Sequence, residues 1–133
     1  MTAHATGPFD VTLSPQPLAG KDVDPKLSRM SIEKQFHGGL EATSIGEMLA
    51  ANTDVKGSAG YVAIEHVTGM LHGRSGSFSL QHNGTLTRGV PQLTVAVVPD
   101  SGAGQLTGLS GSMTITNTAG KHTYDFNYTL PVQ

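Results

Sequence analysis

The chain contains three glycine-bracketed blocks, GSFSLQHNG (residues 76–84), QLTVAVV (92–98) and DSGAGQLTGLSGSMTIT (100–116). In the first block Phe78 and Leu80 alternate with polar residues, which is typical of a strand with one buried face. The block ends in Asn83-Gly84, a dipeptide that favours a two-residue hairpin turn. These blocks therefore predict antiparallel strands joined by short turns, with residues 105–116 in one strand.

The same alternation continues on both sides of these blocks. The expected strands are Phe9–Leu13, a strand from Leu27 to the Gly38-Gly39 break, YVAIEHVTGML (61–71) with a turn near His72-Gly73-Arg74, and YDFNYTL (124–130). In the second of them Met30, Ile32 and Phe36 share one face. Residues 40–49 fit a strand or a short helix at 47–51, and the tight glycine joint before them favours the strand.

Irregular segments are expected at three places. PQPLAGKDVDPK (15–26) has three prolines and no periodicity, residues 50–59 are polar, and residues 1–8 are expected to be a flexible N-terminus. The segment 89–91 interrupts a further strand, and it fits a barrel corner because proline within a sheet needs an edge or a bulge.

About eight short strands and no strong amphipathic helix predict an all-β fold. We expect an eight-stranded antiparallel up-and-down β-barrel, with a β-sandwich as the alternative. The 133 residues fit a single domain, residues 1–133, long enough to bury roughly two-thirds of its extended-chain surface. Seventeen glycines, low charge and no tryptophan agree with a β-rich chain that has many turns.

Composition argues against several classes of function. The chain has no cysteine, which removes disulfides, thiolate nucleophiles and cysteine-bound metals and agrees with a reducing compartment. Eight basic and ten acidic residues give a formal charge of −2 without any run of one sign, so a nucleic-acid partner is not expected. Residues 1–10 lack the basic and apolar regions typical of a signal peptide, and no window approaches the roughly 18 apolar residues of a membrane helix. We expect a soluble, cytoplasmic protein without a membrane partner.

The order of the blocks resembles the allene oxide cyclase-like barrel superfamily. RMSIEKQFHGGLEATSIGEML (29–49) and GSAGYVAIEHVTGMLHGRSGSFSLQHNG (57–84) look like blocks of a bacterial branch known only as a domain of unknown function, DUF3224. The resemblance spans roughly residues 9–130 and implies an allene oxide cyclase-like barrel. Because understood members of the superfamily form trimers, it also implies a homo-oligomer, with outward apolar residues such as Val62 or Val98 at the interface. No catalytic residue is carried over from the plant cyclases.

Glu65 and His82 are the candidate catalytic residues. A carboxylate in an apolar cavity has a raised pKa and can act as an acid or a base, but Glu65 lies in a strand with two similar faces and an outward, solvated position is the alternative. His82 is expected beside the hairpin turn, near the barrel mouth. Depending on the length of the preceding hairpin it lies opposite His66 or opposite Glu65, and the second pairing would orient a general base. The alternative is a strand-end histidine bonded to backbone or water.

The expected barrel interior is either filled by side chains or just wide enough for one small ligand. The candidate ligand-binding residues are Tyr61, His66, Phe78, Tyr124 and Tyr128. Tyrosine offers an apolar body with a polar tip, and the alternative role of all three tyrosines is core filling. No cofactor and no metal are expected, because the six histidines lack close pairs; a metal held by Glu65, His66 and His82 across strands is the remaining alternative.

Three functions fit these observations. The first is binding of a small apolar or amphipathic ligand inside the barrel. The second is an isomerase or cyclase that acts on a hydrophobic substrate in the same cavity through positioning and exclusion of water. The third is a structural, oligomeric scaffold with a filled barrel. A cavity separates the first two functions from the third.

Overall fold

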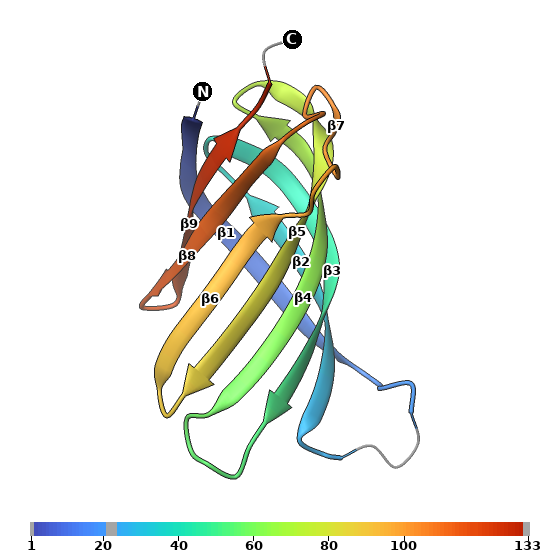
Figure 1. Cartoon of the computed structure of the whole chain (residues 1–133), viewed down its shortest axis with the longest axis vertical. Helices are drawn as coiled ribbons and strands as arrows, with labels where there is room; N and C mark the ends of the chain where they lie inside the picture. The colour runs from blue at the N-terminus through green and yellow to red at the C-terminus, as the bar shows by residue number, and fades with distance from the viewer. Residues whose placement is uncertain (1, 21–23, 132–133) are drawn as a thin grey trace.

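The regular structure of the protein consists of β-strands. A computed structural model describes residues 2–20 and 24–131, and its strands are drawn in Figure 1. Their bounds are β1 Thr2–Gln16, β2 Leu27–Phe36, β3 Leu40–Asn52, β4 Ala59–Leu71, β5 Arg74–Thr87, β6 Val90–Val97, β7 Ala103–Gly104, β8 Ser110–Thr118 and β9 Lys121–Thr129. Within the described ranges no helix is long and apolar enough to cross a membrane.

Eight of these strands form a closed antiparallel barrel. Each long strand pairs with the next one along the chain, and the pairing of β1 with β9 closes the ring. This confirms the predicted up-and-down barrel and excludes the sandwich. The two-residue strand β7 pairs only with β5. The seam between β6 and β8 is the thinnest, since Ala96 and Ser112 are the one residue pair that joins them.

Figure 1 shows the end of the barrel that carries β7 and the C-terminus. The buried apolar side chains of the core fill this end. Fully buried members of this core include Phe36, Phe78 and Phe126. Leu106 and Leu109, from the turns that follow β7, are also buried in it. A closed sheet places alternate side chains inside, so each strand needs only one apolar row to build this core.

The prediction of a hairpin turn at Asn83-Gly84 is wrong, because both residues lie within β5. The turn lies at Arg88-Gly89, where both residues have positive φ angles (47° and 88°). Gly84 has another purpose: a Cβ atom there would lie 2.4 Å from the Tyr61 ring. The glycine therefore leaves room for the Tyr61 ring to cross the strand.

The barrel corner expected at residues 89–91 is also wrong, because Pro91 is the second residue of β6.

The N-terminal segment also differs from the flexible one that is expected. Residues 2–8 belong to β1 and pair with β9, and Ala5 is fully buried. The segment has no large apolar side chain, so its backbone pairing with β9 leaves no hydrophobic pattern in the sequence. Met1 lies outside the described residues.

The remaining boundaries follow the expectations more closely. Residues 40–52 form a strand, which excludes the helix at 47–51. The loop expected at 50–59 narrows to 53–58, and the loop expected at 15–26 begins after Gln16, with residues 21–23 outside the described part. Residues 105–108 are turns, and residue 109 also lies outside the strands, because Gly104 and Gly108 have φ angles of 67° and 86° that interrupt the sheet before β8.

Candidate functional site

Glu65 is fully buried inside the barrel, which excludes the outward alternative. It lies on β4 opposite Gly46 of β3. A Cβ atom at Gly46 would lie only 2.6 Å from the Cα atom of Glu65, so the missing side chain lets the two strands approach closely at this point. The sheet thus carries an acidic side chain in the barrel interior.

Three side chains donate hydrogen bonds to this carboxylate. Lys34 Nζ lies 2.8 Å from Glu65 Oε2, and Ser44 Oγ lies 2.8 Å from Oε1. His82 Nε2 lies 2.5 Å from Oε2. The donors come from β2, β3 and β5, so four strands meet at one buried polar cluster, which we call the Glu65 cluster: Lys34, Ser44, Glu65 and His82.

The pKa of Glu65 is shifted in the direction opposite to that of a buried carboxylate without partners. Burial alone raises it, as the sequence predicts, but the hydrogen bond from His82 and the charge and hydrogen bond of Lys34 outweigh burial and hold it at about 2. Glu65 is therefore an anion at neutral pH, and the expected raised pKa is wrong because the sequence did not show these partners.

His82 reaches Glu65 by a register that neither alternative anticipates. The hairpin turn consists of His72 and Gly73, with Leu71 paired to Arg74, so His82 lies opposite Ala63. The imidazole contacts Glu65 diagonally, on the same face of the sheet and two residues away from direct pairing. His82 is 4% exposed and lies within β5, so it is not a residue of the barrel mouth.

His66 does not join this cluster. It is exposed on the outer face of β4, where its Nδ1 atom lies 3.2 Å from Ser79 Oγ. This excludes the metal site proposed from Glu65, His66 and His82, because the side chains of His66 and Glu65 lie on opposite faces. Nor do residues 2–20 and 24–131 contain another group of three or more potential metal ligands.

Tyr61 extends the Glu65 cluster toward solvent. Its hydroxyl lies 3.3 Å from Nδ1 of His82. Burial, and after it the negative charge of Glu65, raises the pKa of the Tyr61 hydroxyl above its ordinary value, so the group stays protonated at neutral pH. Tyr61, His82 and Glu65 thus form a continuous hydrogen-bonded chain.

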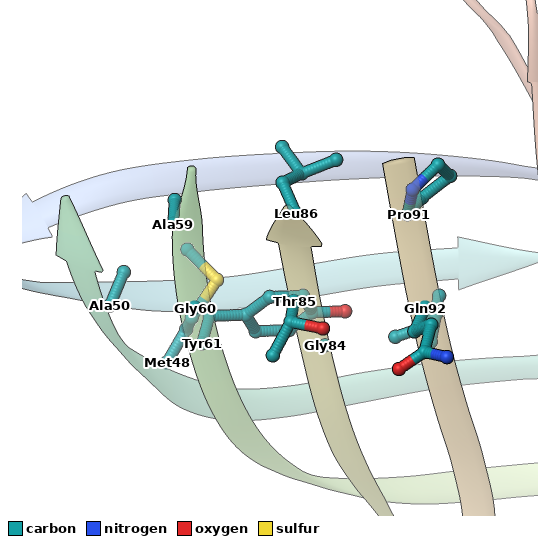
Figure 2. A pocket seen from close by; sticks show the side chains of 11 residues that line it. Met48, Ala50, Ala59, Gly60, Tyr61, Gly84, Thr85, Leu86, Pro91 and Gln92 are labelled. Carbon is teal, nitrogen blue, oxygen red and sulfur yellow. The ribbon is translucent and has the colours of Figure 1, made fainter. Parts of the chain in front are cut away.

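Tyr61 also lines an open pocket of about 320 Å³ at the end of the barrel opposite β7. Figure 2 shows how side chains of β3, β4, β5 and β6 surround this space. Its apolar lining includes Met48, Ala50, Ala59, Leu86 and Leu93. The lining contains no charged residue, and its polar side chains are Tyr61, Thr85 and Gln92.

Three other candidate ligand-binding residues lie away from this pocket, in the filled end of the barrel: Phe78, Tyr124 and Tyr128. Phe78 stacks on Phe126 with ring centroids 5.7 Å apart. The Tyr124 hydroxyl donates to the backbone oxygen of His37 at 2.6 Å, and the Tyr128 hydroxyl lies 2.5 Å from Nδ1 of His72. All three residues are buried and belong to the hydrophobic core.

Sequence reasoning missed Lys34 and Ser44. Lys34 occupies the inward row of β2 between Ile32 and Phe36, and this charged residue in an apolar row was the available signal. Its ammonium group lies 5.0 Å from the centroid of the Phe9 ring, a cation–π distance. Ser44 gave no signal, because serine is common on either face of a strand.

Comparison with known proteins identifies relatives of unknown function. The model of the DUF3224 family, described as a protein of unknown function, matches residues 5–128. The chain is also similar to the crystal structure of a protein with unknown function from the DUF3224 family of Shewanella oneidensis MR-1. The two share 50% sequence identity over the whole of both chains, with a TM-score of 0.92. No curated protein matches the chain.

Proposed function

The chain belongs to the DUF3224 family, and we propose that its barrel binds a small apolar or amphipathic ligand in the open pocket beside Tyr61. The observation that carries this proposal is the apolar, uncharged lining of a space of about 320 Å³. That volume falls at the lower end of the range of small-molecule sites. A small ligand would cover apolar surface that the protein alone leaves exposed.

Two further features support a binding site over incomplete packing. The pocket residues Leu86 and Leu93 are 42% and 43% exposed, although the opposite end of the barrel is densely filled. The Glu65 cluster joins four strands by hydrogen bonds just inside the pocket, which restrains the backbones that carry the lining. A restrained site loses less conformational entropy when a ligand binds.

The proposal is tested with N-phenyl-1-naphthylamine, a neutral dye whose emission rises in apolar surroundings. We expect saturable binding that Ala50→Phe abolishes, because Ala50 lines the pocket and a phenyl group there occupies it. Leu49→Phe is the matched control, since the adjacent Leu49 is half exposed and does not line this pocket. Equal loss in both variants, or binding unaffected by Ala50→Phe, would contradict the proposal.

The second candidate is an isomerase or cyclase that acts on a hydrophobic substrate in the same pocket. The hydrogen-bonded chain from Tyr61 through His82 to Glu65 favours it. A substrate proton would pass to the Tyr61 oxygen as the Tyr61 proton passes to His82, and it would return at another position, so that no other reactant is consumed. Under this proposal Glu65→Gln and His82→Ala lose turnover while ligand affinity persists.

The remaining proposals concern lineage, location and assembly. We propose that the family is a branch of the allene oxide cyclase-like superfamily, on the basis of the eight-stranded antiparallel barrel. The absence of cysteine supports a cytoplasmic location.

A homo-oligomer is supported by four neighbouring, outward apolar residues of β3 and β4 that are each at least half exposed: Ile45, Leu49, Val62 and Ile64. Val98, the other expected interface residue, is half-buried.

A further inference from the structure

We infer that the ligand is an apolar molecule with one anionic group, such as a small carboxylic acid, whose apolar part fills the pocket and whose charge lies at the mouth beside Lys56 and Arg88. The inference rests on the ligand-binding function proposed above and names the class of ligand for that pocket. Three features of the molecule carry it: the lining of the pocket, the two turns at its mouth, and the charges of these turns.

The pocket itself has room only for apolar groups. The surface that it offers to a ligand is almost wholly apolar, and its lining contains no charged residue. A charged group placed inside would lose its hydration without gaining a counter-charge, which is unfavourable. The charged part of an amphipathic ligand must therefore stay at the mouth, in contact with water.

Two turns form one side of this mouth. They are the loop of residues 53–58 between β3 and β4, and the β5–β6 turn at Arg88-Gly89. Pocket-lining residues adjoin both turns: Ala59 directly follows the loop, and Leu86 and Pro91 lie two residues to either side of the β5–β6 turn. Figure 2 shows these three lining residues at the ends of their strands.

Two hydrogen bonds hold the turns together. The backbone nitrogen of Gly89 donates to the backbone oxygen of Gly57 at 2.9 Å, and the backbone nitrogen of Arg88 donates to Ser58 Oγ at 2.9 Å. Because Lys56 directly precedes Gly57, these bonds bring the backbones of Lys56 and Arg88 close together. Neither bond uses the side chain of Lys56 or Arg88, so both side chains can be changed without removing them.

The two turns carry positive charge that the protein does not neutralise. Lys56 and Arg88 are exposed, and within residues 2–20 and 24–131 neither forms an ion pair. The one acidic residue of these turns, Asp54, is paired with Lys26 at 2.9 Å. Two neighbouring cations therefore favour an anion where the charged part of the ligand must lie.

The test compares 2-naphthoate with 2-naphthalenemethanol, a neutral molecule of similar size and shape. The readout is the ratio of their affinities, naphthoate over alcohol, measured by isothermal titration calorimetry. The double variant Lys56→Gln/Arg88→Gln should lower this ratio about two- to tenfold relative to the wild-type protein, because each exposed charge contributes modestly. The difference should shrink as the salt concentration rises from about 0.01 M to about 1 M, because salt screens exposed charges.

Arg74→Gln/Lys121→Gln is the matched control, because it removes two exposed positive charges away from the pocket. Arg74 begins β5 at the filled end of the barrel, and Lys121 lies on β9, which does not line the pocket. The control should retain the wild-type ratio. A ratio that Lys56→Gln/Arg88→Gln leaves unchanged, or that the control lowers as much, would overturn the inference, while binding of the alcohol would leave the proposed function in place. If neither compound binds to the wild-type protein, the proposed function fails and the inference fails with it.

Discussion

The Nε2 atom of His82 lies 2.5 Å from the Oε2 atom of Glu65, although the two residues are not paired across the β4–β5 hairpin. The contact is diagonal, and it becomes possible because both side chains point into the barrel. It links a buried ion pair with Lys34 to a tyrosine at the edge of an apolar pocket. The properties of that tyrosine therefore depend on a carboxylate deep in the barrel.

The Glu65→Gln variant should be strongly destabilised. It leaves Lys34 buried without a counter-charge, and breaking a buried pair in this way costs about 3–5 kcal/mol. The free energy of unfolding, measured by chemical denaturation, checks the loss. Glu33→Gln, on the exposed outer face of β2, is the control and should change it by no more than about 0.5 kcal/mol. The double variant Lys34→Met/Glu65→Gln should recover part of the loss; no recovery would contradict the role of the buried charge.

Stability should fall in acid as Glu65 is protonated. The folded-state pKa of about 2 is below the ordinary value of 4.5, so the ionised form stabilises the fold. This contribution, about 3 kcal/mol, is complete above pH 4.5 and is lost as the pH falls to about 2. The free energy of unfolding, measured by chemical denaturation at several pH values in this range, should change less with pH for Glu65→Gln than for the wild-type protein. An equal pH dependence in the two proteins would show that another group causes the loss of stability in acid.

Gly84→Ala should disturb the pocket through Tyr61. The new methyl group would lie 2.4 Å from Cε1 of the ring, and overpacking of this kind costs about 1–3 kcal/mol. Gly60→Ala is the matched control, because the nearest atom to its Cβ is 3.7 Å away. The unfolding free energy and the near-ultraviolet circular dichroism of the tyrosines should change in the first variant only. Similar changes in both variants would argue against a close contact between Gly84 and Tyr61.

The proposed homo-oligomer should dissociate when the outer face of β3 and β4 becomes charged. Val62 and Val55 are both 52% exposed, but only Val62 lies on this face, next to Leu49. Val62→Lys should therefore reduce the mass measured by sedimentation equilibrium to that of one chain, while Val55→Lys should not. A monomeric wild-type protein, or an unchanged mass in Val62→Lys, would contradict the proposed interface.

The barrel could be predicted because alternation is a local property. Most strands show an apolar row, and counting the strand-like segments gives the eight strands of the barrel. Asn83-Gly84 was misread because the same dipeptide suits a hairpin turn and a strand crossed by an aromatic ring, and only the position of Tyr61 separates the two. The segment 2–8 was missed because its pairing with β9 involves the backbone more than side chains.

The site was only partly predictable because its contacts depend on register across four strands. Glu65 and His82 stood out as polar residues in apolar rows, yet the outward Val62 and Ile64 made the two faces of β4 look alike. Lys34 was visible only as a charge in an inward row. The lowered pKa of Glu65 depends on Lys34 and His82, and the pattern within one strand does not show that these residues contact Glu65.

Methyl NMR during titration with 1-naphthol shows whether the pocket beside Tyr61 binds a ligand, because it locates the ligand on the protein. If the pocket binds the ligand, saturable shifts will be confined to methyl groups of Met48, Ala59, Leu86 and Leu93, and Ala50→Phe will remove them. Shifts at Ile45, Val62 and Ile64 on the outer face in place of these, or no saturable shifts, would contradict it.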